Sequence, residues 1–454
     1  MKQVNRWIYA GIGVAILFFA GVVYAWSVMS GPIAYEYSEA AGKSGAEVWS
    51  AGGLSLAFTI VMIFFCVGCL IGGFLAAKVS ARVYVWVAAL LFLAGFFAAS
   101  FATSLPMLYV SYGIICGLAS GVAYSAVMGT VGKWFPDKQG MISGILLMGF
   151  GISSFLIGRV YAAVTPSSAD AIGNWRTSFR VIGIVSAVVL AVCGFFIRKP
   201  GDDFIPPQGA EKKKKRVNPV AQETKTSLMM KRPAFWLYYL WAVLLSAGGL
   251  ALVSQARGIA TEVGTEISAG TIATVVGLIS IFNGVGRVIL GTLYDKIGRS
   301  TLMQIVNVLF IITGGVLIFA LSSGNFTVLT AGFVIGGLAY GGITPTNSAF
   351  VSDYYGMQYY PKNFSIINTN LIIASFGSTI AGALYDSTQS FLSTCLMILG
   401  LAVAGIFASF GINMADARLL LQEKQGQEIS GITETPVADV TSNAPAPGDQ
   451  QETP

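Results

Sequence analysis

The chain has 454 residues, of which 55% are hydrophobic and 11% are charged, and its formal net charge is +6. Soluble domains carry about a quarter charged residues, so this composition excludes an ordinary soluble protein and predicts a chain surrounded mostly by lipid. Histidine is absent, which removes the commonest catalytic base, proton relay and metal ligand. We therefore expect no enzyme, no metal and no cofactor.

Apolar stretches long enough to cross about 30 Å of hydrocarbon recur along the whole chain. The first stretch follows Lys2 and Arg6 and looks like a signal peptide. It is long enough to span the bilayer and lacks a clear cleavage site, so we interpret it as a signal anchor and first helix. The twelve predicted spans are 7–31, 49–75, 83–104, 107–132, 140–164, 177–197, 235–255, 269–294, 301–321, 326–350, 363–385 and 388–412.

Polar segments divide these spans into two groups of six. We predict a six-helix bundle over 1–197, a cytoplasmic linker over 198–234, a second six-helix bundle over 235–412 and a disordered acidic tail over 413–454. The linker contains a basic run, Lys212 to Arg216, that would attract anionic lipid headgroups. A cytoplasmic loop is expected to be basic in any case, so no nucleic acid is expected as a partner.

The Lys and Arg residues indicate the orientation of the chain. By the predicted spans, 21 of the 27 lie on the side of the N-terminus and four lie on the opposite side. Cytoplasmic loops carry the excess of positive charge. We therefore expect a multi-pass protein of the bacterial inner membrane with both termini in the cytoplasm.

Two polar turns recur between the halves at nearly one spacing. The turn from Gly291 to Arg299 repeats, in weaker form, the turn from Gly73 to Arg82, an offset of 218 (291 − 73). Lys133-Trp-Phe and Asp353-Tyr-Tyr are offset by 220 (353 − 133). Internal repeats of this kind are typical of transporters, and they predict an all-α membrane protein of twelve helices in two pseudo-symmetric bundles.

The stronger of these turns, Gly291-Thr-Leu-Tyr-Asp-Lys-Ile-Gly-Arg299, resembles the signature G-x-L-x-D-[KR]-x-G-[KR] of the major facilitator superfamily. In that family the acid latches the outward-open state by pairing with basic groups and a neighbouring helix end. The resemblance implies a gating motif in both halves, and Ala77 stands where the first half should carry the acid. The implied motif residues are Gly73, Lys78, Arg82, Gly291, Asp295, Lys296, Gly298 and Arg299.

Two further segments, from Lys133 to Gly144 and from Arg232 to Trp236, look like the oxalate/formate antiporter group, which also contains bacterial relatives of monocarboxylate transporters. The resemblance covers roughly residues 5 to 412. It implies a monomeric transport unit that moves a small organic anion by alternating access.

Arg287 is a cation deep in the predicted eighth helix, about 12 Å from Asp295 along the helix axis. An arginine at the centre of a membrane helix costs about 2.5–3.5 kcal/mol on insertion scales, so it normally faces a cavity or a partner. A substrate carboxylate would accept two parallel hydrogen bonds from it. The alternative is a structural arginine that bonds helix carbonyls. The family resemblance implies that Arg287 binds the substrate carboxylate.

Two amides accompany this cation. Asn283 lies one helical turn before Arg287 and stands where animal monocarboxylate transporters tend to have an acid implicated in proton coupling; an amide does not titrate, and packing alone would also explain it. The oxalate-specific pattern has a second cation, which the resemblance places at Leu371, next to Asn370. One cation suits a monocarboxylate better than a dicarboxylate, and we expect Asn370 to bond the substrate.

Tyr24, Tyr124 and Tyr340 match aromatic positions that line the cavity in the family resemblance. Tyrosine offers a rigid apolar wall with a hydroxyl donor, which suits a small anion, although aromatic residues in spans also serve packing alone. The predicted function is secondary transport of a monocarboxylate of the lactate, pyruvate or formate class, by proton symport or anion exchange. Alternatives are an oxalate/formate-type antiporter, a neutral-solute carrier in which Arg287 is dispensable, and a metabolite sensor that does not transport.

Overall fold

The computed structural model describes residues 5–38, 41–49, 51–165, 172–201, 204 and 220–429. Within these ranges all regular secondary structure is helical. Twelve helical segments of the described residues are long and apolar enough to cross a membrane. This confirms the predicted number of spans. The basic run Lys212 to Arg216 and the tail after 429 lie outside the described residues.

The first half contains six spans. Its first span combines α1, a 3-10 turn η1 and α2, and its fourth combines α5, a π-helical stretch η4 and α6. The elements are α1 (Arg6–Ala20), η1 (Gly21–Ala25), α2 (Trp26–Glu36), α3 (Ala51–Leu75), α4 (Ala81–Ala99), α5 (Leu105–Leu108), η4 (Tyr109–Cys116), α6 (Gly117–Val131), α7 (Gln139–Val164) and α8 (Asn174–Phe196), with short 3-10 turns η3 (Gly45–Glu47) and η5 (Gly132–Trp134).

The second half repeats this arrangement after a short linker helix, α9. Its fifth span, the eleventh of the chain, is broken into α14, α15 and α16. The elements are α9 (Thr226–Met229), α10 (Pro233–Val263), α11 (Ala269–Ile297), α12 (Arg299–Ser323), α13 (Phe326–Tyr355), α14 (Tyr360–Asn368), α15 (Asn370–Ala374), α16 (Phe376–Thr388) and α17 (Leu392–Ile429).

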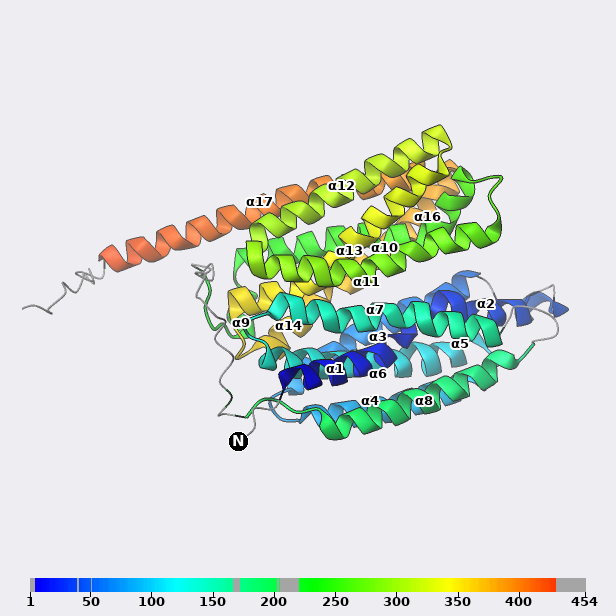
Figure 1. Ribbon diagram of the computed structural model, residues 1–454, viewed down its shortest axis with the longest axis horizontal. Coiled ribbons are helices and arrows are strands. Elements are labelled where there is room, and N and C mark those ends of the chain that lie inside the picture. Colours follow the sequence, from blue (N-terminus) through cyan, green and yellow to red (C-terminus); the bar gives the residue numbers. More distant parts are fainter. Residues whose placement is uncertain are drawn as a thin grey trace, which may run out of the picture.

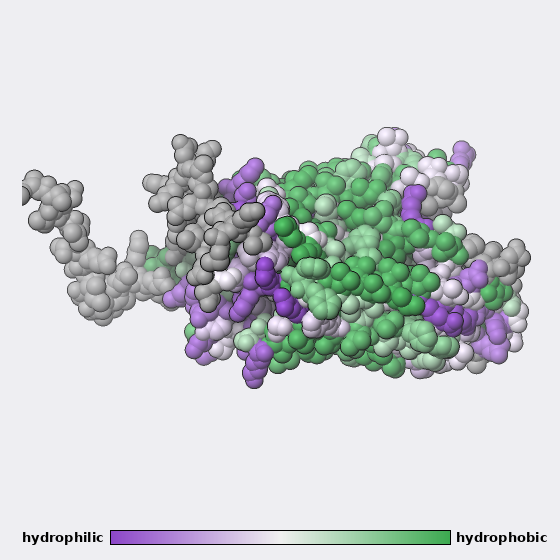
Figure 2. Space-filling model, turned by 60° about the horizontal axis from the view of Figure 1, so that its bottom comes forward, coloured by the Kyte–Doolittle hydropathy of each residue, from purple (hydrophilic) through white to green (hydrophobic). Residues whose placement is uncertain are grey.

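The two halves lie side by side, with α1 to α8 below and most of the second half above in Figure 1, where α14 reaches down beside the first half. The N-terminus, α9 and the long free end of α17 gather at one end of the bundle, which we call the terminal end. Figure 2 shows a hydrophobic band across the middle of the molecule between hydrophilic ends. This distribution is the one that a membrane-spanning bundle requires, because its middle contacts hydrocarbon.

The halves meet closely where α7 crosses α11. A Cβ atom at Gly140 would collide with the carbonyl oxygen of Gly291, and one at Gly144 would collide with the carbonyl oxygen of Arg287. Small residues let helix backbones approach in this way in membranes. Gly140 and Gly144, one helical turn apart, therefore form a close contact, or seam, between the halves. The seam includes the backbone of Arg287, the predicted site residue.

The last helix differs from the predicted span. We placed its end at 412 and a disordered tail beyond it, but α17 continues to Ile429. Asp416, four residues past the predicted end, pairs with Arg299 of α12 at 3.2 Å and so holds the first turn of this extension. Acidic residues that the sequence alone assigns to a solvated tail thus include one that anchors a helix.

Candidate functional site

Arg287 lies on α11, and its side chain crosses to the other half of the molecule. Its Nε donates a hydrogen bond to Oδ1 of Asn283 at 2.9 Å, and its Nη1 donates one to the backbone carbonyl of Leu147 at 2.6 Å. Asn283 belongs to the same helix, whereas Leu147 belongs to α7 in the first half. The guanidinium therefore forms a bridge between the halves.

Glycines make room for this bridge on both sides of α11. A Cβ atom at Gly151 on α7 would lie 3.4 Å from Cζ of Arg287, in contact with the guanidinium. On the other side, a Cβ at Gly341 of α13 would collide with the carbonyl oxygen of Asn283. The sequence thus keeps side-chain bulk away from both faces of α11 at the level of the arginine.

The charge of Arg287 has no carboxylate partner within the described part of the chain. Ion pairs elsewhere in that part include Arg6–Asp137, Lys43–Glu47, Arg176–Glu36 and Arg299–Asp416. Asn283 and the Leu147 carbonyl are neutral, so they satisfy N–H donors without cancelling the positive charge. A cation held in this way provides a strong field for an anion in a region of low dielectric.

The three tyrosines that the family resemblance assigns to the cavity lie near this charge. Tyr24, Tyr124 and Tyr340 all lie within electrostatic range of the Arg287 guanidinium. The first two come from the first half and Tyr340 comes from α13 in the second half. Tyr24 and Tyr340 are half-buried, whereas Tyr124 is buried. The structure therefore brings the four predicted residues together, and their contact with a substrate stays a prediction.

Aromatic packing fixes two of these rings. Tyr24 lies in η1 and packs edge-on against Phe58 and Phe150, with ring centroids 5.8 and 5.1 Å apart. Tyr124 stacks on Phe364 of α14 at 5.9 Å. Since Phe364 belongs to the second half, Tyr124 also joins the halves. The rings are thus held rigidly around the arginine, which keeps the entropic cost of binding a ligand low.

Asn370 lies where the eleventh span is broken. Its Nδ2 donates to the Ile367 carbonyl at 2.6 Å, and its buried Oδ1 accepts no hydrogen bond from the described residues. Sequence reasoning missed its neighbour Asn368, which is 1% exposed and whose Nδ2 and Oδ1 both lack a partner there. An unsatisfied buried amide costs about 1–3 kcal/mol. The signal in the sequence was the pair of amides flanking Thr369 in an otherwise apolar span.

The motif acid Asp295 joins the halves at the terminal end. Its Oδ1 accepts a hydrogen bond from the backbone N–H of Gly140 and its Oδ2 accepts one from Met141, both at 2.9 Å. These amides begin α7, whose N-terminus carries the positive end of the helix dipole. The acid therefore pairs with a neighbouring helix end, as the family resemblance implied.

The other motif residues of the second half shape the turn between α11 and α12. Gly298 has a φ of +77°, which a residue with a side chain rarely adopts. The buried Arg299 donates from Nε to the hydroxyl of Tyr354 at 2.7 Å and from Nη2 to Asn413 at 2.6 Å and to Asp416. Arg299 thus ties together α12, α13 and α17, while Lys296 is exposed.

The motif of the first half is less closely connected. Lys78 is exposed, and Arg82 donates from Nε to the carbonyl of Ile197 at 3.4 Å. Gly73 contacts the second half, because a Cβ there would collide with the side chain of Ser365. The first-half motif therefore keeps its close helix contact without a carboxylate of its own.

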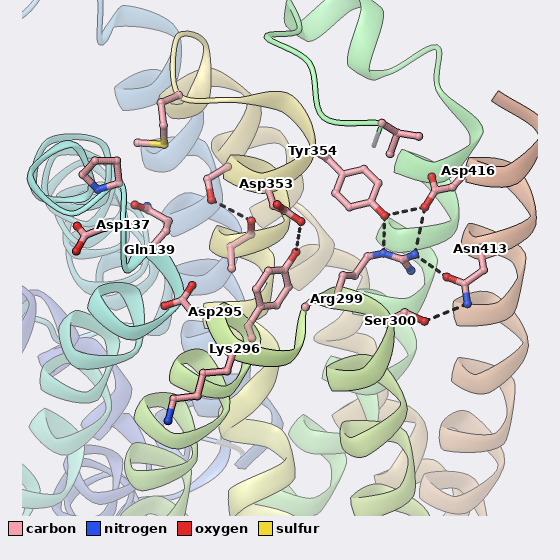
Figure 3. A pocket seen from close by; sticks show the side chains of 17 residues that line it. Asp137, Gln139, Asp295, Lys296, Arg299, Ser300, Asp353, Tyr354, Asn413 and Asp416 are labelled. Atoms are coloured by element: carbon pink, nitrogen blue, oxygen red, sulfur yellow. Dashed lines mark hydrogen bonds and ion pairs between the residues drawn. The ribbon is translucent and has the colours of Figure 1, made fainter. Parts of the chain in front are cut away.

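A cavity of about 530 Å³ opens beside the motif residues of the second half (Figure 3). Its wall combines the start of α7, the turn between α11 and α12, the end of α13 and the middle of α17. The charged side chains that line it are Asp137, Asp295, Lys296, Arg299, Asp353 and Asp416. Four of the five predicted motif residues of the second half, Asp295, Lys296, Gly298 and Arg299, thus line one space at the terminal end.

Comparison with known proteins agrees with this architecture. The family model "Major Facilitator Superfamily" matches residues 10–369 and 251–434. The chain belongs to the major facilitator superfamily. It is therefore a multi-pass transporter of the bacterial inner membrane and not an enzyme.

Within this superfamily the chain is similar to the oxalate:formate antiporter of Oxalobacter formigenes, with 28% identity over 84% of this chain and 85% of the relative. It is 25% identical to the uncharacterized transporter YhjX of Escherichia coli K12, over 82% and 86% of the two chains. Monocarboxylate transporter 12 of Mus musculus is 30% identical over 28% of this chain and 25% of its own length.

A solved superfamily structure shares the fold. The proton:xylose symporter XylE superposes with a TM-score of 0.69 over 89% of this chain and 95% of its own, at 14% identity. At this identity the likeness concerns the fold alone. It supports the arrangement of two six-helix halves around a common centre.

Proposed function

We propose that this superfamily member transports a small organic anion, a monocarboxylate of the lactate, pyruvate or formate class. The observation that carries the proposal is the uncompensated charge of Arg287, which lies between the halves with an amide and a carbonyl as its partners. A carboxylate would neutralise this charge and accept charge-assisted hydrogen bonds from the guanidinium. The similarity to an oxalate:formate antiporter and to monocarboxylate transporters supports the same class.

The surroundings favour one carboxylate over two. Leu371, the position expected to carry a second cation in an oxalate site, is apolar and half-buried. The other polar groups that we expect at the site are the hydroxyls of the three tyrosines and the amide of Asn370, and the unpaired amide of Asn368 adjoins it. These groups bond neutral oxygens of a substrate, such as a hydroxyl or keto oxygen, but they supply no second positive charge.

The bridge to Leu147 indicates how binding would act on the conformation. The Nη1 atom of Arg287 holds the first half through this carbonyl. A carboxylate that takes over Nη1 removes one link between α11 and α7 while cancelling the charge. In alternating access, the halves then rock about the bound substrate. The proposed transport unit is a monomer with both termini in the cytoplasm. Its transport is coupled either to a proton or to a counter-anion.

The test is uptake into liposomes that contain the purified protein. Labelled lactate, pyruvate, formate and oxalate would be followed with and without a pH gradient, for the wild type and for Arg287→Gln. We expect monocarboxylate uptake in the wild type and a loss of apparent affinity of at least about tenfold in the variant, because a hydrogen bond to a charged group contributes about 1.5–3 kcal/mol.

Arg159→Gln is the matched control. Arg159 is also an arginine within a span, but it is exposed and lies over the ring of Phe155 on its own helix, 5.1 Å from the centroid. This control should transport normally. Normal transport by Arg287→Gln would remove Arg287 from the site, and movement of none of the four anions would show that the substrate class is wrong.

A further inference from the structure

The first-half motif lacks its acid, but another carboxylate accepts hydrogen bonds from the backbone just ahead of α14. In the second half, Asp295 accepts hydrogen bonds from two amides in the first turn of α7, those of Gly140 and Met141. The internal repeat places Ala77 at the position of Asp295, an offset of 218 (295 − 77). A methyl group accepts no hydrogen bond, so the equivalent amides near α14 need another partner.

Glu223 of the linker supplies that partner. Its Oε1 accepts a hydrogen bond from the backbone N–H of Met357 at 3.1 Å, and its Oε2 accepts one from Gln358 at 3.0 Å. This geometry, one carboxylate on two consecutive amides, is the geometry of Asp295. Met357 and Gln358 follow Gly140 and Met141 by 217 residues (357 − 140), one residue short of the repeat offset of 218 and three short of 220, so they lie just ahead of α14.

The backbone ahead of α14 is built to receive a carboxylate. Gly356 has a φ of +73°, and a Cβ atom there would collide with the carboxylate of Glu223. Successive backbone amides in a turn form a concave anion-binding nest. Gly356 thus serves both the conformation of the nest and the access of the carboxylate.

The segment that carries Glu223 is docked on the second half. The N–H groups of Gln222 and Thr224 donate to the carbonyls of Tyr354 and Tyr355 at 3.2 and 3.1 Å. The side chain of Asn363, which is buried in α14, bonds both Thr224 and Thr226. Hydrogen bonds on both sides of Glu223 therefore hold its carboxylate over the nest.

The helix that Glu223 holds makes the second contact between the halves at the terminal end. A Cβ atom at Gly73 would collide with Ser365 and contact the carbonyl of Pro361 at 2.5 Å, and Lys362 lies over the ring of Phe74 at 4.4 Å. All of these α14 residues lie within its first two turns. The position of the start of α14 thus decides how closely α3 and α14 meet.

We propose that Glu223 is a positioning residue of the transport cycle, which takes the role of the missing acid at position 77 and keeps the terminal end closed by holding α14 against α3. The closed gate is then asymmetric. Asp295 fastens α7 from the opposite half, whereas Glu223 fastens α14 from within its own half and through the linker. The proposal relies on the alternating access of the proposed function but not on the identity of its substrate.

Cys66 is a native reporter for this test. It is fully buried on α3, and its Sγ lies 3.5 Å from the carbonyl oxygen of Asn368 at the end of α14. Because the thiol is buried at this contact, separation of α3 and α14 should expose it to a maleimide. The rate of Cys66 modification would be measured by peptide mass in the purified full chain without substrate, so that a wrong substrate class leaves the test intact.

Glu223→Gln should raise the modification rate about fivefold, because loss of a capping carboxylate typically changes an equilibrium by that factor. Asp295→Asn should raise it too, as the positive control. Ala77→Asp in the Glu223→Gln background should return the rate toward that of the wild type, because it restores the acid where the repeat expects it. Glu266→Gln, an exposed change at the opposite end, should have no effect.

Two results would overturn the proposal. One is a wild-type rate for Glu223→Gln while Asp295→Asn raises it. The other is a raised rate that Ala77→Asp leaves unchanged, which would show that Glu223 does not stand in for the motif acid. Glutamine has the shape of glutamate and position 223 is exposed, and a melting temperature in detergent close to that of the wild type would verify that the variant is folded.

Discussion

At the scale of single residues, the arrangement around Arg287 separates two tasks that a carboxylate partner would combine. Asn283 and Leu147 orient the guanidinium by hydrogen bonds, and neither removes its charge. An acid paired with a buried arginine would neutralise its charge and leave little field for a substrate. The presence of an amide instead of an acid at position 283 therefore supports an anion site as much as the arginine does.

Asn283→Asp tests this separation. The new carboxylate would lie where Oδ1 of Asn283 now accepts the bond from Nε, so it would pair with Arg287 and neutralise it. We expect uptake of a monocarboxylate at neutral pH to fall by about tenfold or more. Acidification should restore uptake, because protonation of the introduced carboxylate would free the guanidinium.

The measurement is initial uptake against pH at a fixed anion gradient, with the wild type as the control. The expected sign is recovery of the variant relative to the wild type as the pH falls. A variant that keeps full uptake at neutral pH would show that the charge of Arg287 is not what binds the substrate.

At the scale of the helices, the seam between α7 and α11 depends on the absence of side chains. Gly144→Ala would place a methyl group against the carbonyl oxygen of Arg287. Overpacking of this kind costs about 1–3 kcal/mol, which outweighs the roughly 1 kcal/mol that alanine gains over glycine inside a helix. We expect a lower melting temperature in detergent and slower transport.

Gly315→Ala on α12 is the matched control, since no atom lies within 4 Å of the Cβ position there. It should leave transport unchanged and raise the melting temperature slightly. If the two variants behave alike, the close approach of α7 and α11 does not limit the cycle.

Arg299 and Asp416 form the other helix-scale contact that can be tested. The pair is largely shielded, with side-chain exposures of 7% and 16%. Arg299→Gln leaves Asp416 without its cation, and breaking a buried pair typically costs about 3–5 kcal/mol. We expect a marked drop in melting temperature, and a smaller drop for Arg299→Gln combined with Asp416→Asn, because that double variant leaves no uncompensated charge.

At the scale of the whole molecule, much of the architecture could be predicted from the sequence. The twelve spans follow from hydropathy, because each helix must satisfy its own backbone in lipid. The two-fold organisation follows from the repeated turns at Gly73 and Gly291. The grouping of Arg287 with three tyrosines came from the family resemblance, and the structure places them around one charge.

The remaining features depend on contacts between segments far apart in the chain. Leu147 contributes a backbone carbonyl, which no side-chain pattern reveals. Glu223 lies in a linker whose composition indicates only a polar segment. Its proposed role depends on the contact with the backbone at Gly356 and Met357, which the sequence does not predict. The end of α17 was misplaced because Asp416, in an acidic stretch, pairs with an arginine that is 117 residues away.

The length of α17 also has a practical use. Its 38 residues extend to about 57 Å, well beyond the roughly 30 Å of hydrocarbon, so a continuous helix projects from the terminal end (Figure 1). A helical protein fused in register after Leu421 would keep a fixed orientation, because the Arg299–Asp416 ion pair holds α17 in place. Such a rigid handle would serve as an alignment marker for electron microscopy of a 47.8 kDa chain that is otherwise largely hidden in a micelle.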